Sequence, residues 1–173
     1  MKQHGMTLVE LIMVIATITI LLGVAIPSYS YLLNNARLVM LSNGMVRALN
    51  LARSEAIKRN VRVTLCKTSL ANNATPVCDP AAEWHQGWLI FVDQGVVGVL
   101  DGSDEVVAAH AHPPVGASVT TSNFSSFASF LPSGISQGTN HLPNGTFHIC
   151  LAGEEHRVIL NNAGRIRTSR AAC

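Results

Sequence analysis

Two hydrophobic patterns follow each other along the first part of the chain. The first is a continuous run: from Leu11 to Ile26 every residue is apolar, Gly or Thr, and the first charged side chain after Glu10 is Arg37. At about 1.5 Å of rise per residue, a helix over residues 6–28 reaches the roughly 30 Å of a bilayer hydrocarbon core. The run therefore predicts a membrane-spanning helix.

The second pattern is the spacing of an amphipathic helix, and it begins beyond Pro27. A proline can kink a helix without ending it, and apolar side chains then recur every three or four positions until Arg59 and Asn60. We expect residues 29–59 to be the second half of one long helix, with its apolar side packed on a globular head. The expected buried positions are Leu38, Leu41, Met45, Leu49, Ala52 and Ala56, and the expected solvated positions are Arg37, Asn43, Arg47, Asn50, Arg53 and Arg59.

Short runs typical of β-strands occupy residues 60–173. Asn144-Gly145 and Asn162-Ala163-Gly164 are hairpin signals, and short connections favour antiparallel pairing. The fold class expected is α+β, with the long helix laid across one or two small antiparallel sheets. The expected strands are Val61 to Cys66, Trp88 to Asp93, Val106 to Ala109, Ser118 to Thr121, Phe127 to Leu131, Thr146 to Cys150, Arg157 to Asn161 and Arg165 to Thr168.

Charge is distributed unevenly along the chain. The formal net charge is only +2, but the segment from Asp79 to Glu105 has acidic side chains and no Lys or Arg. The segment from His156 to Cys173 has arginines and no acidic side chain. This asymmetry predicts a basic edge rather than a basic protein.

The 4 cysteines lack the spacing of a zinc site and fit an oxidising compartment. Of the possible pairings we favour Cys66 with Cys78 and Cys150 with Cys173, because each closes a local loop; free or differently paired thiols are the alternative. Each bridge would stabilise the fold by roughly 3 kcal/mol on the chain-entropy estimate. The second bridge would attach the arginine-rich tail to the strand that contains Cys150.

The polar leader, residues 1–5, is not followed by the small-residue cleavage site of an ordinary signal peptide. Gly5, Met6, Thr7, Leu8, Val9 and Glu10 together resemble the processing motif of type IV pilins and type II secretion pseudopilins. The resemblance implies cleavage after Gly5 by a prepilin peptidase and methylation of the new N-terminus at Met6. It also implies that Glu10, costly inside a membrane, pairs with the N-terminal amine of a neighbouring subunit. The alternative is a plain signal anchor with an isolated glutamate.

Further motifs resemble the FimT/GspH group of minor pilins and pseudopilins, over nearly the whole chain. They are Ala52-Arg53-Ser54-Glu55-Ala56 with Arg59-Asn60, Gly87-Trp88-Leu89-Ile90-Phe91-Val92-Asp93, Phe130-Leu131-Pro132-Ser133-Gly134 and Gly164-Arg165-Ile166-Arg167. The resemblance implies the pilin fold and no enzymatic activity. It also implies an inner-membrane protein with a periplasmic head, residues 29–173, which then enters a filament with other pilins.

In the FimT branch, the element at Gly164, Arg165 and Arg167 resembles one that binds DNA during natural transformation. Side chains two apart on a strand project from one side, and guanidinium groups suit phosphate oxygens. We therefore expect a DNA-binding edge made of Gly164, Arg165, Arg167, Arg170 and Arg157. Binding would be independent of base sequence and sensitive to salt. Two alternatives are an edge strand protected from aggregation by its arginines, and a type II secretion pseudopilin with a structural role and no DNA binding.

Other chemistry has little support in the sequence. His110 and His112 have no third metal ligand nearby, no nucleophile or phosphate-binding motif occurs, and no cofactor is expected. A membrane-anchored periplasmic enzyme is therefore disfavoured. Trp84 is expected in the core, with exposure for a partner as the alternative.

Overall fold

The computed structural model describes residues 7–111 and 116–173, so the cleavage site at Gly5 and Met6 lies outside the described residues. The chain divides into two compact units, Met1–Ala36 and Arg37–Cys173. Helix α1 (Leu8–Arg59) contributes to both units. The predicted head, by comparison, begins at residue 29.

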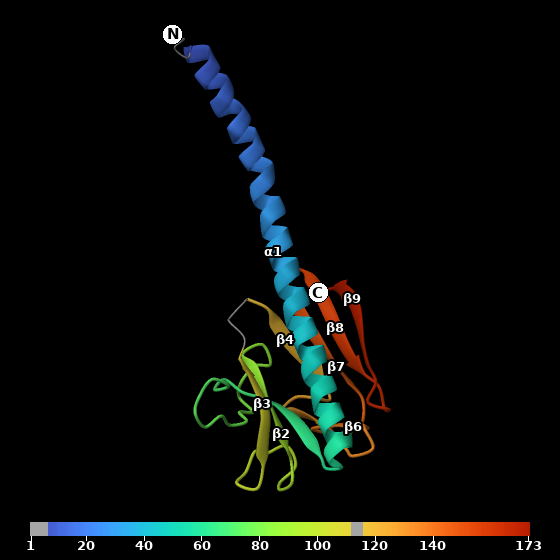
Figure 1. Cartoon of the computed structure of the whole chain (residues 1–173). Helices are drawn as coiled ribbons and strands as arrows, with labels where there is room; N and C mark the ends of the chain where they lie inside the picture. The colour runs from blue at the N-terminus through green and yellow to red at the C-terminus, as the bar shows by residue number, and fades with distance from the viewer. Residues whose placement is uncertain (1–6, 112–115) are drawn as a thin grey trace. The chain divides into compact units, whose positions relative to one another are not determined.

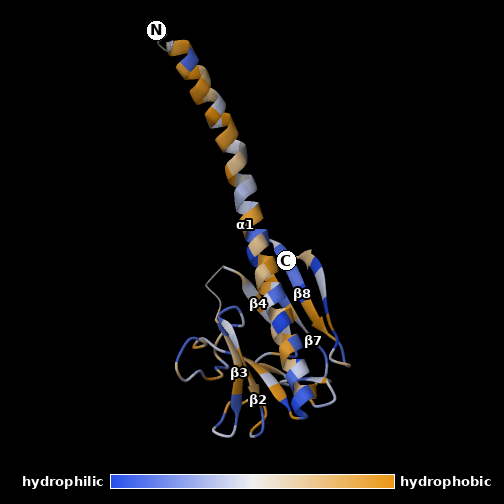
Figure 2. Ribbon diagram, in the orientation of Figure 1, coloured by the Kyte–Doolittle hydropathy of each residue, from blue (hydrophilic) through white to orange (hydrophobic). Residues whose placement is uncertain are grey.

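In the first unit, helix α1 starts with a cap made by Thr7. The Thr7 hydroxyl accepts a hydrogen bond from the Glu10 backbone N–H at 3.3 Å, and the acidic Glu10 lies in the first turn. The following turns expose large apolar side chains, which colour this part of the helix mostly orange in Figure 2. Within the described residues, α1 is the one helix long and apolar enough to cross a membrane.

In the second unit, α1 buries the apolar side that the spacing predicts. Leu38, Leu41, Met45, Leu49, Ala52 and Ala56 are all at most 2% exposed. The helix ends at Arg59, and Asn60 follows with φ of 55°, the left-handed conformation common after a helix C-terminus. The predicted end of the helix is thus confirmed.

In the part of the second unit that the structure describes, nine strands form two antiparallel sheets (Figure 1). Sheet A has 5 strands in the order β3-β2-β1-β5-β6, and sheet B has 4 strands in the order β4-β7-β8-β9. The strands of sheet A are β1 (Val63–Lys67), β2 (Gly87–Val92), β3 (Glu105–Ala111), β5 (Phe127–Phe130) and β6 (Ser136–Gly138). Those of sheet B are β4 (Ser118–Ser122), β7 (Gly145–Leu151), β8 (Glu154–Leu160) and β9 (Ile166–Ala172).

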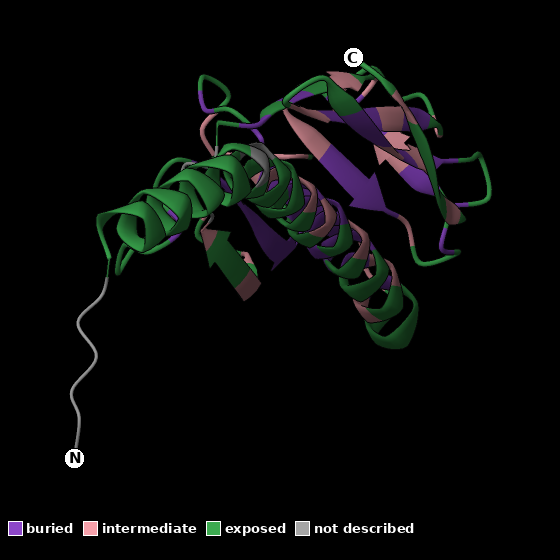
Figure 3. Ribbon diagram, turned by 90° about the horizontal axis from the view of Figure 1, so that it is seen from above, coloured by how far each residue is buried: buried purple, intermediate pink, exposed green. Residues whose placement is uncertain are grey.

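One core joins α1 to both sheets. Leu65 and Phe130 of sheet A, and Phe147 and Val158 of sheet B, belong to the same buried cluster as the apolar side of α1. Figure 3 shows these buried segments in purple, on the strands and along the helix. We call the face of each sheet that takes part in this core its inner face, and the opposite one its outer face.

The outer face of sheet A carries a second, smaller cluster. Cys66, Leu89 and Phe91 are at most 1% exposed there, packed against Phe127. The disulfide between Cys66 and Cys78 ties the loop after β1 to this cluster. The strands β1 and β2 of sheet A are therefore covered on both faces, whereas the edge strand β3 is largely exposed.

Both disulfides favoured from the local loops are present. The Cα atoms lie 5.7 Å apart for Cys66 and Cys78 and 6.0 Å apart for Cys150 and Cys173. The second bridge fastens the end of β9 to β7, since Cys150 belongs to β7 and Cys173 directly follows β9.

The structure corrects several details of the predicted strands. Asn144-Gly145 is not a hairpin turn, because β6 before it belongs to sheet A whereas β7 after it pairs with β4 and β8 in sheet B. The sequence does not predict strand β6, because Ser136–Gly138 lacks the alternation of apolar residues that marks a strand. The core position expected for Trp84 is confirmed: the residue is 2% exposed and donates its indole N–H to the Phe124 carbonyl at 3.0 Å, which rules out the alternative of an exposed role.

Candidate nucleic-acid interface

The β8–β9 hairpin carries the predicted basic edge, and its turn is fixed by Asn161. The Asn161 side-chain oxygen accepts the N–H groups of Ala163 at 3.1 Å and Arg165 at 2.8 Å. The Gly164 N–H donates to the Asn161 carbonyl at 2.9 Å, and Gly164 has φ of 70°. Such a left-handed residue suits glycine, and the hairpin predicted at Asn162-Ala163-Gly164 is confirmed.

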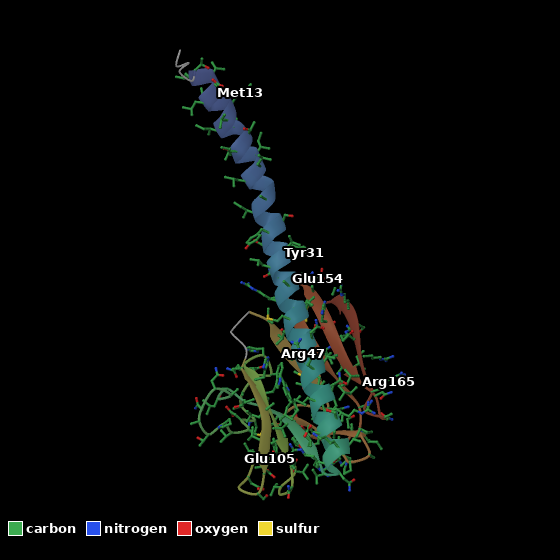
Figure 4. The ribbon with its side chains drawn as sticks, viewed as in Figure 1. Met13, Tyr31, Arg47, Glu105, Glu154 and Arg165 are labelled. Atoms are coloured by element: carbon green, nitrogen blue, oxygen red, sulfur yellow. A yellow bond between two sulfur atoms is a disulfide. The ribbon has the colours of Figure 1, made fainter. Side chains whose placement is uncertain are left out.

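Arg165 and Arg167 project from the outer side of this hairpin, as the alternation predicts. Ile166 lies between them, pairs with the buried Leu160 and packs on the core, so its neighbours turn outward. Both arginines are exposed, and Figure 4 shows Arg165 pointing away from the sheets. Among the described residues, neither arginine is joined to an acidic side chain.

Arg170 belongs to the other face. Strand β9 extends to Ala172, well beyond the predicted end, and Arg170 pairs with His156, whose ring is on the inner face with its Nδ1 3.1 Å from the Ser42 hydroxyl of α1. Burial lowers the pKa of His156, and the nearby positive charge of Arg170 lowers it further. The structure therefore separates Arg170 from Arg165 and Arg167.

Arg157 is on the outer face but is already paired. Its guanidinium donates to one oxygen of Glu155, with Nε at 2.8 Å and Nη2 at 2.7 Å, and His148 Nδ1 lies 2.6 Å from the other oxygen. The Glu155 side chain is only 5% exposed. The hydrogen bonds from Arg157 and then His148 lower the pKa of Glu155, and Glu155 in turn raises the pKa of Arg157. Much of the charge of Arg157 is thus compensated within the protein.

The rest of the outer face of sheet B is polar and forms a shallow depression. Strand β4 contributes its hydroxyl groups, and β7 and β8 contribute the side chains of His148, Glu155 and Arg157. The lining residues are Thr120, Thr121, Ser122, His148, Cys150, Glu155, Arg157, Ala172 and Cys173. The depression lies beside the arginines of β9, since β8 and β9 are neighbours.

The described part of the chain contains no metal-binding cluster. Within residues 7–111 and 116–173, no group of three His, Cys, Asp or Glu side chains could hold a metal ion. His112 of the His110 and His112 pair lies outside the described residues, and the His110 ring lies 5.4 Å from that of Trp88.

Arg53 contacts the turn of the β8–β9 hairpin, although the helical pattern predicts that it faces solvent. The spacing puts it on the solvated side of α1, but its Nε donates to the Gly134 carbonyl at 3.1 Å and its Nη2 to the Ala163 carbonyl at 3.0 Å. The pairing of Glu155 with Arg157 was also missed, although residues two apart on a strand share a face and the spacing could have revealed it.

The comparisons with known proteins agree with this architecture. The model of the family described as "Type II transport protein GspH" matches residues 41–164. The chain is 32% identical over 110 residues to the pilin-like protein PilA1 of Thermus thermophilus, covering 64% of this chain and 61% of PilA1. The chain therefore spans less than two thirds of that relative.

Two crystal structures of the minor pilin FimU of Pseudomonas aeruginosa share the fold. Their TM-scores are 0.59 and 0.55 at 16% identity, covering 78% and 75% of this chain and 90% of FimU in each case.

A long N-terminal helix packed on antiparallel sheets, with these relatives, defines a type IV pilin-like protein. Since the family match spans more than half of the chain, the protein belongs to the GspH family, within the GspH/FimT group.

Proposed function

We propose that this chain is a minor pilin of a type IV pilus, without enzymatic activity, that binds DNA for uptake in natural transformation. The observation that carries the proposal is the pair of exposed guanidinium groups at Arg165 and Arg167, on one side of the β8–β9 hairpin and without acidic partners among the described residues. Phosphate contacts of this kind carry no base-sequence information. The interface therefore suits DNA of any sequence.

The N-terminal segment gives the route to the filament. The protein is inserted in the inner membrane as a prepilin with its second unit in the periplasm, and a prepilin peptidase cuts between Gly5 and Met6. The new N-terminus at Met6 is methylated, and the chain then leaves the bilayer and packs with other pilins. The first turn of α1, with its positive helix dipole, stabilises the Glu10 carboxylate until a neighbouring subunit's amine pairs with it.

The positions of the arginines also limit how many of them can contact DNA phosphates. With Arg157 paired to Glu155, and with the exposed Arg170 on the opposite face of β9 from Arg167, Arg165 and Arg167 are the principal contacts. Neutralising two phosphates of duplex DNA gives a slope of log affinity on log salt of about −1.8.

Titration of the full chain in a non-ionic detergent with duplex DNA of mixed sequence tests this proposal. Fluorescence anisotropy at several salt concentrations gives both affinity and slope. The double variant Arg165→Ala with Arg167→Ala should weaken binding by at least tenfold and bring the slope close to zero, because both phosphate contacts are lost.

The matched control removes two exposed arginines from α1, Arg37→Ala with Arg47→Ala. It changes the net charge equally but leaves β9 intact, so it should retain most of the affinity and the slope. Equal losses in the two variants would show a response to overall charge and would refute the β9 interface.

The second candidate is a structural pseudopilin of a type II secretion system, which the family description favours. In that case the gene lies beside secretion genes, and its deletion stops protein export without changing transformation. A strain with the Arg165→Ala and Arg167→Ala substitutions separates the two candidates: transformation should fall while pilus assembly and protein export remain normal.

A further inference from the structure

Three segments that are distant in the sequence meet at the β8–β9 turn. They are α1 at Arg53, the Pro132-Ser133-Gly134 turn after β5, and the Ala163-Gly164 turn. Arg53 is 81 residues from Gly134 and 110 residues from Ala163 in the chain. Each segment lies in or beside one of the motifs that resemble the FimT/GspH group. The sequence alone does not show that these motifs are in contact.

The two turns touch through their glycines. A β-carbon on Gly164 would collide with the Gly134 carbonyl oxygen and would lie 3.3 Å from Arg53 Nε. Gly134 also has a positive φ, 78°, and a β-carbon there would lie 3.2 Å from Arg53 Nε. Gly164 is therefore needed for close approach as well as for backbone conformation, whereas Gly134 is needed chiefly for backbone conformation.

Arg53 joins the two turns by its fork of donors. Nε donates to the Gly134 carbonyl and Nη2 to the Ala163 carbonyl, and the Arg53 residue is only partly exposed. Ala163 is two residues before Arg165, so this bond fixes the backbone from which the Arg165 side chain starts. A charged donor to a carbonyl is stronger than a neutral one.

We propose that Arg53 is a positioning residue of the DNA-binding edge: it holds the β8–β9 turn against the Gly134 turn, so that Arg165 is presented in one orientation. This inference rests on the proposed function. Arg53 acts through Arg165, and its own guanidinium is occupied by the two carbonyls. Lysine cannot replace it, since a single ammonium lacks the planar fork that bonds both carbonyls.

A double-mutant cycle on DNA affinity tests the inference, with the full chain in detergent and the duplex DNA described above. Arg53→Met should weaken binding about fivefold to tenfold, the loss expected when one charge-assisted phosphate contact is misplaced. In an Arg165→Ala background, Arg53→Met should have no further effect, because the residue that it positions is gone. Arg53→Lys should bind like Arg53→Met although its charge is retained.

The matched control is Arg47→Met, which removes the same charge from an exposed position of the same helix. It should bind as the wild type does. The inference is overturned if Arg53→Met binds like Arg47→Met, if its effect persists in the Arg165→Ala background, or if Arg53→Lys restores affinity.

Amide hydrogen exchange tests the positioning without DNA. In Arg53→Met the peptide over residues 161–167 should exchange about tenfold faster than in the wild type, while peptides from β7 remain unchanged. Unchanged exchange at the turn would overturn the positioning role. If instead Arg165→Ala leaves DNA affinity unaltered, the proposed function fails, and the exchange result still decides whether Arg53 holds the turn.

Discussion

The two sheets pack on the same segment of α1, but their outer faces have opposite characters. The outer face of sheet A is covered by loops and buries Leu89 and Phe91 completely. The outer face of sheet B remains open and carries hydroxyl groups, the ion pair of Glu155 with Arg157, and Arg167. A sheet buried on both faces stabilises the fold, whereas an open polar face can bind a partner.

A buried carboxylate on each sheet shows the same contrast. Asp93, 5% exposed at the end of β2, accepts the Thr64 hydroxyl at 2.5 Å and the Gly98 N–H at 2.9 Å, and burial raises its pKa. Glu155 is buried to a similar extent, but its bonds to Arg157 and His148 lower its pKa. Sheet B therefore contains partly compensated ions, and sheet A contains a carboxylate whose charge is disfavoured.

The largest difference between the outer faces should appear in the free energy of unfolding. Phe91→Ala removes a fully buried ring from the cluster on sheet A and should cost about 3 to 5 kcal/mol. Thr120→Ala, at an exposed position on the outer face of sheet B, should cost less than about 0.5 kcal/mol. Urea unfolding followed by the fluorescence of the buried Trp84 and Trp88 measures both, and similar costs would contradict the assignment of sheet A to stability.

Local patterns in the sequence predicted much of this architecture. The buried side of α1 follows from helical periodicity, and the hairpin at Gly164 follows from turn chemistry, since both depend on residues close in the chain. The orientation of Arg165 and Arg167 follows from alternation for the same reason.

Long-range contacts could not be predicted in this way. The division into two sheets, the strand β6, and the contact of Arg53 with Ala163 all join residues that are far apart in the chain. Arg170 is exposed, as predicted, but it does not share a face with Arg167, because the length of β9, and hence the face on which residue 170 lies, depends on pairing with β8. The charge pattern predicted a basic edge, but only the pairing shows which arginines are available.

Acidification should affect sheet B through Glu155. Its pKa in the folded protein is below the ordinary value of about 4.3. The stabilisation is therefore fully present above that ordinary value and is lost as the pH falls through the folded value. Glu155→Gln should cost about 1 to 2 kcal/mol at pH 7, since Arg157 loses its charged acceptor. It should also reduce the loss of stability between about pH 5 and 3.

The control for Glu155 is the neighbouring exposed carboxylate, Glu154→Gln. It removes the same charge without breaking the pair with Arg157, so the free energy of unfolding should change by less than about 0.5 kcal/mol. Unfolding at pH 7 and across the acid range measures both variants. Equal behaviour of the two variants would show that the pair of Glu155 with Arg157 contributes no specific stability.

The smallest effect on the free energy of unfolding is expected at Asp93. Its dependence on pH should also be opposite to that of Glu155. Because burial raises its pKa in the folded protein, stability falls as the pH rises from the ordinary value of about 3.9 through the folded value. Asp93→Asn keeps an acceptor for Thr64 and Gly98, so the unfolding free energy at pH 7 should change by no more than about 1 kcal/mol. As the pH rises above about 4, however, the wild type should lose stability relative to the variant. Asp101→Asn gives the contrasting control, because hydrogen bonds from Ser103 lower the pKa of Asp101 and reverse the slope. Parallel pH profiles for the wild type and Asp93→Asn would mean that the outer face of sheet A solvates this charge as well as water does.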